Sequence, residues 1–386
     1  MESEVGKGKK ARLAYGFDDI AIVPSRRTRD AEEVDTSFSL GSHKFKLPFL
    51  TSAMDGVVDV DIALKVGKLG GLGVINLEGL QTRYENPAKV LDEIAKFDKK
   101  EATRKLQEIY KEPVKVELIG KRVEEIKKGG VVAAASLTPQ KVDKYHKHAL
   151  EAGLDILVIQ GTVVSADHVS KISTPLDLKS FIPKLGIPVI VGGCCSYSTS
   201  LHLMRTGAVG ILVGVGPGAA CTTRRVLGIG VPQATAIADA AAARARHLEE
   251  TSKYVSVIAD GGMRSGGDIA KAIACGADAV MIGSPIAGAK EAPGKGFHWG
   301  MATFHPELPR GTRIEVGQRA TLEEILVGPA YENDGTLNLF GALRMSMATC
   351  GYENIKAFQK AEVMIAPALQ TEGKSHQQIQ NVGMGS

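Results

Sequence analysis

One arrangement recurs along this chain and restricts its fold more than any other feature. An amphipathic stretch is followed by a glycine and then by a short apolar run, as in "HALEAGLDILVIQG", "HLMRTGAVGILVGV" and "AIACGADAVMIGS". The glycines, Gly153, Gly207 and Gly276, can adopt the left-handed conformation that ends a helix. Because the apolar runs do not alternate with polar residues, they are typical of parallel strands that are covered on both faces.

Eight apolar runs of this kind stand at 47–53, 71–75, 131–136, 156–160, 188–193, 210–215, 255–262 and 279–284. Eight parallel strands with helices between them indicate an α/β protein of the (β/α)8 TIM barrel type. A doubly wound open sheet is the alternative, although eight strands is a high number for that class. We predict a single (β/α)8 barrel domain over residues 1–386. Thr138 and Pro139 are predicted to start one helix, as its N-cap and first residue.

The composition argues against several classes of protein. A net charge of +4 over 386 residues is small and spread out, so no nucleic acid partner is expected. No apolar run approaches the roughly 18 residues that span a bilayer, and the first ten residues lack the apolar centre of a signal peptide. No membrane partner is therefore expected. Five cysteines without framework spacing fit a reducing cytoplasm.

The barrel also predicts where the chemistry lies, because active sites in this fold form at the C-terminal ends of the strands. In this chain those ends are rich in glycine and polar residues. The last two strands are followed by "DGGMRSGGDI" and by Gly283 and Ser284, where backbone amides can bind an anion such as a phosphate. Ordinary tight turns are the alternative for either loop alone. Two such loops after neighbouring strands favour a phosphate site.

The stretch "GVGPGAACTTRRVLGIGVPQ" (214–233) places Cys221 just after a glycine-rich exit from the sixth predicted strand. Cys221 is either a buried cysteine after a turn or a nucleophile held beside an anion site. The other four cysteines are interpreted as structural. Residues 77–130 are predicted to be mainly helical. Residues 285–340 are rich in glycine, proline and polar residues and follow the last strand, so we predict an active-site flap there.

Several motifs together resemble the IMP dehydrogenase and GMP reductase family. The Cys221 stretch resembles the family's catalytic-cysteine signature. Other family segments are resembled, in the same order, by "YGFDDIAIVPS", "LPFLTSAMD", "IADGGMRSGGDIAKAIACGADAVMIGSPIAGAKEAPG" and "LFGALRMSMATCGY". The residues after the eighth strand look like the dehydrogenase form. The regulatory two-module (CBS) insertion that most IMP dehydrogenases carry is absent, as it is in the reductases.

The resemblance implies oxidation of inosine 5′-monophosphate (IMP) to xanthosine 5′-monophosphate (XMP) with NAD⁺, in GMP biosynthesis, by a cytoplasmic homotetramer. Cys221 would attack the purine, and Thr223 would help to position the water that releases XMP. The substrate would contact Ser52, Met54, Gly218, Asp260, Gly262, Gly283, Ser284, His298, Met301 and Ala302. The cofactor would contact Gln160, Thr162, Gly214, Val215 and Gly216, and a potassium ion Gly216, Gly218 and Cys221. The tail, 371–386, would contact a neighbouring subunit.

The chain departs from the family's pattern at several positions. Ala219 replaces a serine that contacts the phosphate, and Gln160 replaces an aspartate that contacts the cofactor ribose. His298 replaces a phosphate-binding tyrosine, and Ala302 replaces a glycine. These departures leave the affinity for the phosphate and the choice of cofactor open.

Further departures concern the flap and the tail. Arg310 stands where an acidic or amide side chain normally contacts the base. The arginine–tyrosine pair that activates the hydrolytic water is not found, and Arg310 or Arg313 with Tyr331 is the candidate substitute. The Lys374 ammonium is a candidate substitute for potassium. Three alternative functions stay open: an NADPH-dependent GMP reductase, a catalytically lapsed purine-nucleotide sensor and a flavin-dependent oxidoreductase.

Overall fold

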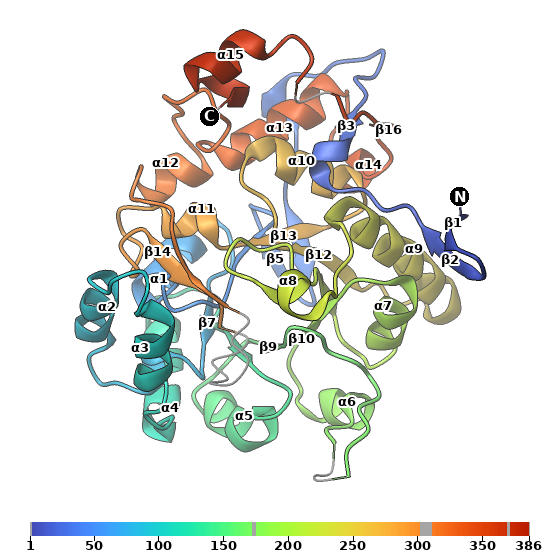
Figure 1. Ribbon diagram of the computed structural model, residues 1–386. Coiled ribbons are helices and arrows are strands. Elements are labelled where there is room, and N and C mark those ends of the chain that lie inside the picture. Colours follow the sequence, from blue (N-terminus) through green and yellow to red (C-terminus); the bar gives the residue numbers. More distant parts are fainter. Residues whose placement is uncertain (1, 172–174, 302–310, 369–370, 386) are drawn as a thin grey trace.

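The computed structural model describes residues 2–171, 175–301, 311–368 and 371–385 (Figure 1). Within this part of the chain, eight parallel strands form one sheet in the order β6-β13-β12-β11-β10-β9-β8-β7. Their bounds are β6 Phe49–Thr51, β7 Val74–Asn76, β8 Ala134–Leu137, β9 Ile156–Gln160, β10 Val189–Cys194, β11 Gly210–Val213, β12 Ser256–Asp260 and β13 Ala279–Ile282. Leu50 forms a parallel bridge with Leu72, just before β7, which closes the sheet into a ring. The predicted TIM barrel is confirmed, and each predicted run overlaps one strand.

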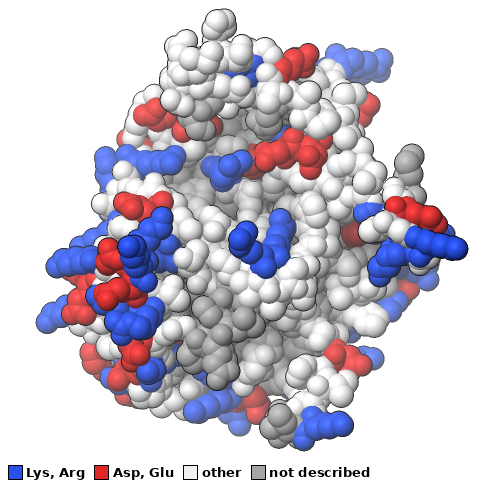
Figure 2. All heavy atoms as spheres, viewed as in Figure 1, with Lys and Arg blue, Asp and Glu red and all other residues white. Residues whose placement is uncertain are grey.

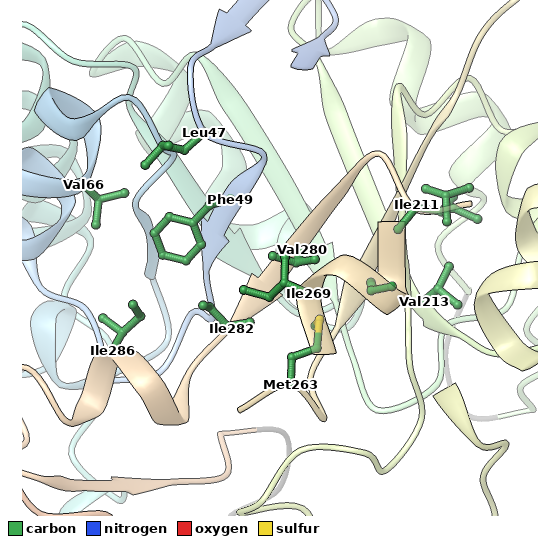
Figure 3. Packing of buried hydrophobic residues seen from close by; sticks show 14 of the residues in the cluster. Leu47, Phe49, Val66, Ile211, Val213, Met263, Ile269, Val280, Ile282 and Ile286 are labelled. Carbon is green, nitrogen blue, oxygen red and sulfur yellow. The ribbon is translucent and has the colours of Figure 1, made fainter. Parts of the chain in front are cut away.

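Alternate residues of the strands belong to two different layers. Ile211 and Val213 of β11 and Val280 and Ile282 of β13 pack in the layer between strands and helices (Figure 3). The residues between them in sequence, Leu212 and Met281, belong to the separate cluster that fills the barrel. This period of two places apolar side chains on both faces of each strand, which is why the runs in the sequence are continuous.

A short hairpin covers the end of the barrel at which the strands begin. β4 (Phe38–Leu40) pairs with β5 (His43–Phe45), and Phe38, Leu40 and Phe45 join the inner apolar cluster. The hydroxyl of Ser256, the first residue of β12, donates to the Ser39 carbonyl at 3.3 Å. The opposite end of the barrel, where the strands finish, is left for the polar residues.

The sequence predicts where the helices around the barrel end, but it does not predict every helix start correctly. Gly153, Gly207 and Gly276 follow α5 (Val142–Glu151), α7 (Tyr197–Met204) and α10 (Gly266–Ala274) with φ of +87°, +93° and +114°. The prediction that Thr138 caps α5 is wrong. Residues 139–141 form a turn of their own, because the Thr138 carbonyl accepts from the amides of Lys141 (3.1 Å) and Val142 (2.9 Å).

Two additions to the barrel lie beside each other on one flank. The residues between β7 and β8 form η3 (Leu80–Thr82), α2 (Pro87–Ala95), α3 (Ala102–Ile109) and α4 (Val116–Lys128). After β13 and α11 (Ser284–Ala287), β14 (Phe297–Trp299) pairs with β15 (Arg313–Glu315), and α12 (Leu322–Leu326) and α13 (Leu339–Thr349) follow. Figure 1 shows β14 beside α2 and α3.

The termini lie on the outside of the barrel. The N-terminal hairpin of β1 (Glu2–Gly6) and β2 (Lys9–Arg12) is tied to α9 (Gln233–Thr251) by Arg12, which donates to both Asp239 carboxylate oxygens at 3.0 Å. The chain ends in α15 (Ser375–Gln380) and η5 (Gly383–Gly385). β3 (Ile20–Ile22) pairs with β16 (Val363–Ile365), which joins the two terminal segments.

The hydropathy of the helices and the surface charge of the protein both agree with the sequence. None of the helices in the described ranges is long and apolar enough to cross a bilayer. On the face drawn in Figure 2, basic and acidic side chains are intermingled, most densely over α2, α3 and α4. This mixture agrees with the small net charge of the chain.

A buried ion cluster ties the barrel to its outer helices. Asp278, 2% exposed, accepts hydrogen bonds from Arg244 of α9 (2.7 Å), Tyr254 (2.7 Å) and Gln359 (2.8 Å) and also contacts Lys356 of α14 (Ile355–Phe358). Burial by itself would raise the pKa of Asp278, but Arg244 and Lys356 outweigh it and lower the pKa below its ordinary value.

We predict that Asp278→Ala destabilises the fold by about 3–5 kcal/mol, because it leaves the largely buried Arg244 guanidinium without its carboxylate. Arg246→Ala is the control, since Arg246 pairs with Glu250 at an exposed site and should change stability by less than about 1 kcal/mol. Urea unfolding followed by circular dichroism measures both. A change for Asp278→Ala no larger than the control's would show that the cluster does not stabilise the fold.

Candidate active site

The C-terminal ends of the strands surround one cavity of about 520 Å³. It is lined by residues that come from every part of the barrel, as the closed ring requires. Those predicted from the sequence that line it are Ser52, Met54, Gln160, Thr162, Gly214, Gly216, Gly218, Cys221, Asp260, Gly262, Gly283, Ser284, His298 and Met301. The loops of the predicted phosphate site and the Cys221 loop thus open onto the same space.

The Cys221 loop leaves β11 in a conformation that its glycines allow. A Cβ on Gly214 would lie 2.2 Å from the Asp260 carbonyl oxygen, so any side chain there would separate the loop from β12. The Cys221 amide donates to the Gly218 carbonyl at 3.0 Å. The Cys221 thiol is partly exposed in the cavity and donates to the Thr223 hydroxyl at 3.1 Å. Thr223, 1% exposed, begins α8 (Thr223–Leu227).

Asp260 and Gln160 meet across the cavity. The Gln160 amide, at the end of β9, donates to the Asp260 carboxylate at 3.0 Å. Burial raises the pKa of Asp260 to about 7, and the hydrogen bond from Gln160 opposes this only in part. The carboxylate keeps accepting capacity for ligand hydroxyls. Asp260, expected to contact the substrate, and Gln160, expected to contact the cofactor, are therefore coupled directly in the free protein.

The predicted phosphate end of the cavity combines backbone amides with one hydroxyl. Gly262 precedes α10, whose N-cap, Ser265, accepts from the Asp268 amide. Across the cavity, the Ser284 hydroxyl and His298 Nε2 are joined by a hydrogen bond of 3.0 Å. Burial lowers the pKa of His298 to about 4, so its imidazole is neutral at neutral pH. Its Nδ1 is buried and has no hydrogen-bond partner among the described residues.

The β14–β15 hairpin lies against the Cys221 loop. Gly311 forms an antiparallel bridge with Cys221, and the Thr312 amide donates to the Ala220 carbonyl at 3.0 Å. Met301, just after β14, lines the cavity. The predicted Ala302 and Arg310 lie outside the described residues. The hairpin, which is not part of the barrel sheet, thus forms one wall of the site beside Cys221.

Comparison with known proteins identifies the family. A profile described as "IMP dehydrogenase / GMP reductase domain" matches residues 14–305. The chain belongs to the IMP dehydrogenase / GMP reductase family. An uncharacterized oxidoreductase of Mycobacterium tuberculosis is 47% identical over 94% of this chain and 99% of its own length. The IMP dehydrogenase of Cryptosporidium parvum is 34% identical over 75% of this chain and 70% of its own.

A solved structure extends the similarity to the fold. The crystal structure of an IMP dehydrogenase/GMP reductase-like protein from Corynebacterium glutamicum has a TM-score of 0.90 and 44% identity. It covers 94% of this chain and 97% of that chain. Family membership makes this protein an oxidoreductase of the IMP dehydrogenase / GMP reductase type.

The positions of some residues in this structure do not support the roles that were predicted for them. The Arg313 guanidinium donates to the carbonyls of Ile94 and Phe97, both at 2.5 Å, so it is turned toward α2. Tyr331 lines a second cavity, of about 1050 Å³, and neither residue lines the cavity at Cys221. The role of Lys374, which stands just before α15, concerns a neighbouring subunit and stays a prediction. Val215 is buried behind the loop, where its carbonyl accepts from Arg224 at 3.3 Å.

Sequence reasoning also missed supporting residues. The buried Gln233 amide donates to the carbonyls of Val213 (2.8 Å) and Asp260 (3.0 Å) and so holds the ends of β11 and β12 together. Its place at the first position of α9, at the end of the Cys221 motif, was the available signal. The contact between Tyr110 and Trp299 had no such signal, because the two lie far apart in the sequence.

We predict that iodoacetamide at neutral pH alkylates Cys221 well before Cys194 and Cys275. Burial raises the pKa of Cys194 to about 12 and of Cys275 to about 11, and the thiolate is the reactive form. Peptide mass spectrometry over time measures the three rates, and the urea-unfolded protein, in which all should react alike, is the control. Alkylation of Cys194 as fast as Cys221 would contradict the placement of Cys221 in the open cavity.

Proposed function

We propose that this protein oxidises IMP to XMP with NAD⁺ and water, releasing NADH and a proton, in GMP biosynthesis. The observation that carries the proposal is that the Cys221 thiol opens into the same cavity as the other residues expected to bind substrate and cofactor. Asp260, Gly262 and Ser284 line this cavity, and so do Thr162 and Gln160, whose amide donates to Asp260 at 3.0 Å. A nucleotide that is held by its ribose and phosphate at Asp260, Gly262 and Ser284 would present its purine to the thiol.

The proposed steps follow from the chemistry of the purine. The thiol loses its proton, and the sulfur adds to C2 of hypoxanthine. The hydrogen on C2 then leaves with its electron pair, and the C–S bond to Cys221 remains. Water attacks C2, the C–S bond breaks, and the thiol regains a proton as XMP leaves. Thr223, whose hydroxyl lies 3.1 Å from Sγ in the free protein, would orient this water.

We propose that the cavity also takes the nicotinamide end of NAD⁺, the cofactor that the family implies. NAD⁺ bound there would supply the acceptor for the hydride from C2. Gln160, Thr162 and Gly214 would hold it next to the purine, and the Gln160 amide would then be shared between cofactor and Asp260. Potassium would be held by the carbonyls of Gly216, Gly218 and Cys221. The Gly218 carbonyl already accepts from the Cys221 amide, but its second lone pair leaves it able to bind a cation.

A GMP reductase that uses NADPH is the second candidate. The neutral Gln160, in place of the aspartate expected for the dehydrogenase, is the observation in its favour. Both reactions would use Cys221 at C2 of the purine, so the cysteine does not discriminate between them. We also propose a homotetramer in which the tail contacts a neighbouring subunit, on the basis of the family resemblance.

We predict that the wild-type protein reduces NAD⁺ with IMP and leaves NADPH unchanged with GMP, and that Cys221→Ala abolishes turnover while IMP still binds. The ribose and phosphate contacts lie elsewhere, so calorimetry should find the affinity for IMP within a few-fold of wild type. Absorbance of the reduced nicotinamide measures turnover, and Cys195→Ala is the control. Oxidation of NADPH by GMP would establish the second candidate instead.

We predict that Asp260→Asn weakens IMP binding roughly tenfold or more, because charge-assisted hydrogen bonds to the ribose contribute about 1.5–3 kcal/mol each. The wild-type affinity should also fall as the pH falls below about 7, where the raised pKa lets the carboxylate gain a proton. The IMP phosphate titrates for both proteins, so the difference between their pH profiles isolates Asp260. Identical profiles would place the ribose elsewhere.

A further inference from the structure

The β14–β15 hairpin packs on a small apolar core that is separate from the barrel's two layers. Trp299, 1% exposed, belongs to a cluster with Leu80, Leu91, Ile94 and Leu106 from η3, α2 and α3. Figure 1 shows β14 beside these helices. The wall of the active site beside Cys221 is therefore supported by the segment between β7 and β8.

Polar contacts join the same two segments. The Arg313 guanidinium donates to two carbonyls at the end of α2 and lies 4.5 Å from the centre of the Phe297 ring. Lys295, just before β14, pairs with Asp92 of α2 at 2.5 Å. These contacts hold the outer part of the hairpin, away from the cavity.

A chain of hydrogen bonds holds the inner part. Trp299 Nε1 donates to the Tyr110 hydroxyl at 2.8 Å, and that hydroxyl donates to Asp55 Oδ2 at 2.5 Å. The Leu80 amide donates to the same carboxylate oxygen at 2.8 Å. Asp55 follows β6, so the chain of bonds runs from the hairpin through the end of α3 to the barrel. It is the direct polar link between Trp299 and a strand end of the ring.

This link is sealed from water. Asp55 is 1% exposed, and its Oδ1 has no partner among the described residues. A Cβ on Gly79 would lie 2.1 Å from that oxygen, so glycine at 79 allows the carboxylate its place. Burial raises the pKa of Asp55 to about 6, and the hydrogen bond from Tyr110 opposes the shift. Loss of the phenol hydroxyl would leave two buried polar groups, on Trp299 and on Asp55, short of a partner.

The link also reaches the cavity. The Met301 sulfur lies 3.4 Å from the Tyr110 hydroxyl, and Met301 lines the cavity. We propose that Tyr110 is a positioning residue of the active site, whose hydroxyl, held between Trp299 and Asp55, fixes the hairpin so that Met301 lies against the bound nucleotide. The contacts above support the statement that Tyr110 positions the hairpin. The effect of this positioning on catalysis rests on the proposed function.

The experiment compares Tyr110→Phe with Tyr84→Phe. Both tyrosines pack with the same small core, but the Tyr84 hydroxyl donates to the Ile109 carbonyl at 2.8 Å and makes no hydrogen bond to the described residues of the hairpin. Trp299 is the only tryptophan in the sequence, so the fluorescence of the whole protein reports on the hairpin. Trp299→Phe keeps an aromatic ring, removes the donor and serves as the fluorescence blank and as a second kinetic variant.

We expect Tyr110→Phe to shift the Trp299 emission to longer wavelength and to raise KM for IMP roughly tenfold, with a smaller change in kcat. Trp299→Phe should raise KM in the same direction, and Tyr84→Phe should match the wild type in emission and kinetics. If the tyrosine hydroxyls only stabilised the fold, both tyrosine variants would unfold at a lower temperature, and KM measured below that temperature would be unchanged. Wild-type emission and KM in Tyr110→Phe would overturn the proposal.

The two proposals can fail separately. If wild-type protein turns over neither IMP with NAD⁺ nor GMP with NADPH, the proposed function fails. The emission of Tyr110→Phe against Tyr84→Phe still decides whether the hydroxyl holds the hairpin. If Tyr110→Phe does not fold, Trp299→Phe leaves the bond from Tyr110 to Asp55 in place, and an unchanged KM in that variant would overturn the proposal.

Discussion

Closure of the parallel sheet between β6 and the residues before β7 is the constraint on which the rest of this structure depends. The Thr51 amide donates to the Leu72 carbonyl at 3.0 Å, and the Leu72 amide donates to the Phe49 carbonyl at 2.9 Å, which joins β6 to the residues before β7. Because all eight strands run the same way round a closed ring, their C-terminal ends meet at one opening, and residues as distant in sequence as Ser52 and Asp260 line one cavity. In an open sheet of the same strand order, the ends of β6 and β12 would lie two strands apart, and Gln160 and Thr162 would stand further along a flat edge, without a common enclosed space.

The sequence predicts the parts of this structure that depend on local rules. Continuous apolar runs mark strands that are covered on both faces, and glycine marks helix ends, as at Gly153 and Gly276, because both effects act within a few residues. The start of α5 escaped prediction because Thr138 offers its carbonyl, and not its side chain, to the next turn. The orientation of Arg313 could not be predicted because its partners are the main-chain carbonyls of Ile94 and Phe97, and main-chain groups leave no signal in the residue types.

The same limit applies to the candidate site. Cys221 and Asp260 could be singled out because each stands at a strand end next to glycines. Their surroundings could not, since the coupling of Asp260 to Gln160 joins β12 to β9 and depends on the ring being closed. The electrostatic state of the site is a tertiary property too. Burial keeps the His298 imidazole neutral and raises the pKa of Asp260 to about 7, so at neutral pH the site presents a neutral amide, a neutral imidazole and a partly protonated acid to a ligand.

The apolar residues form separate clusters, and these clusters support different parts of the active site. The strand ends that would hold ribose and phosphate are fixed by the two layers of the barrel, whereas the hairpin beside Cys221 is packed on the cluster of α2 and α3. Local opening of a protein follows such cooperative units. The two units meet at Asp55, whose buried carboxylate accepts from the Tyr110 hydroxyl and the Leu80 amide, and at Cys221, which forms a bridge with Gly311 of the hairpin. With the role proposed for Tyr110, the segment between β7 and β8 would therefore help to set the geometry at the cysteine.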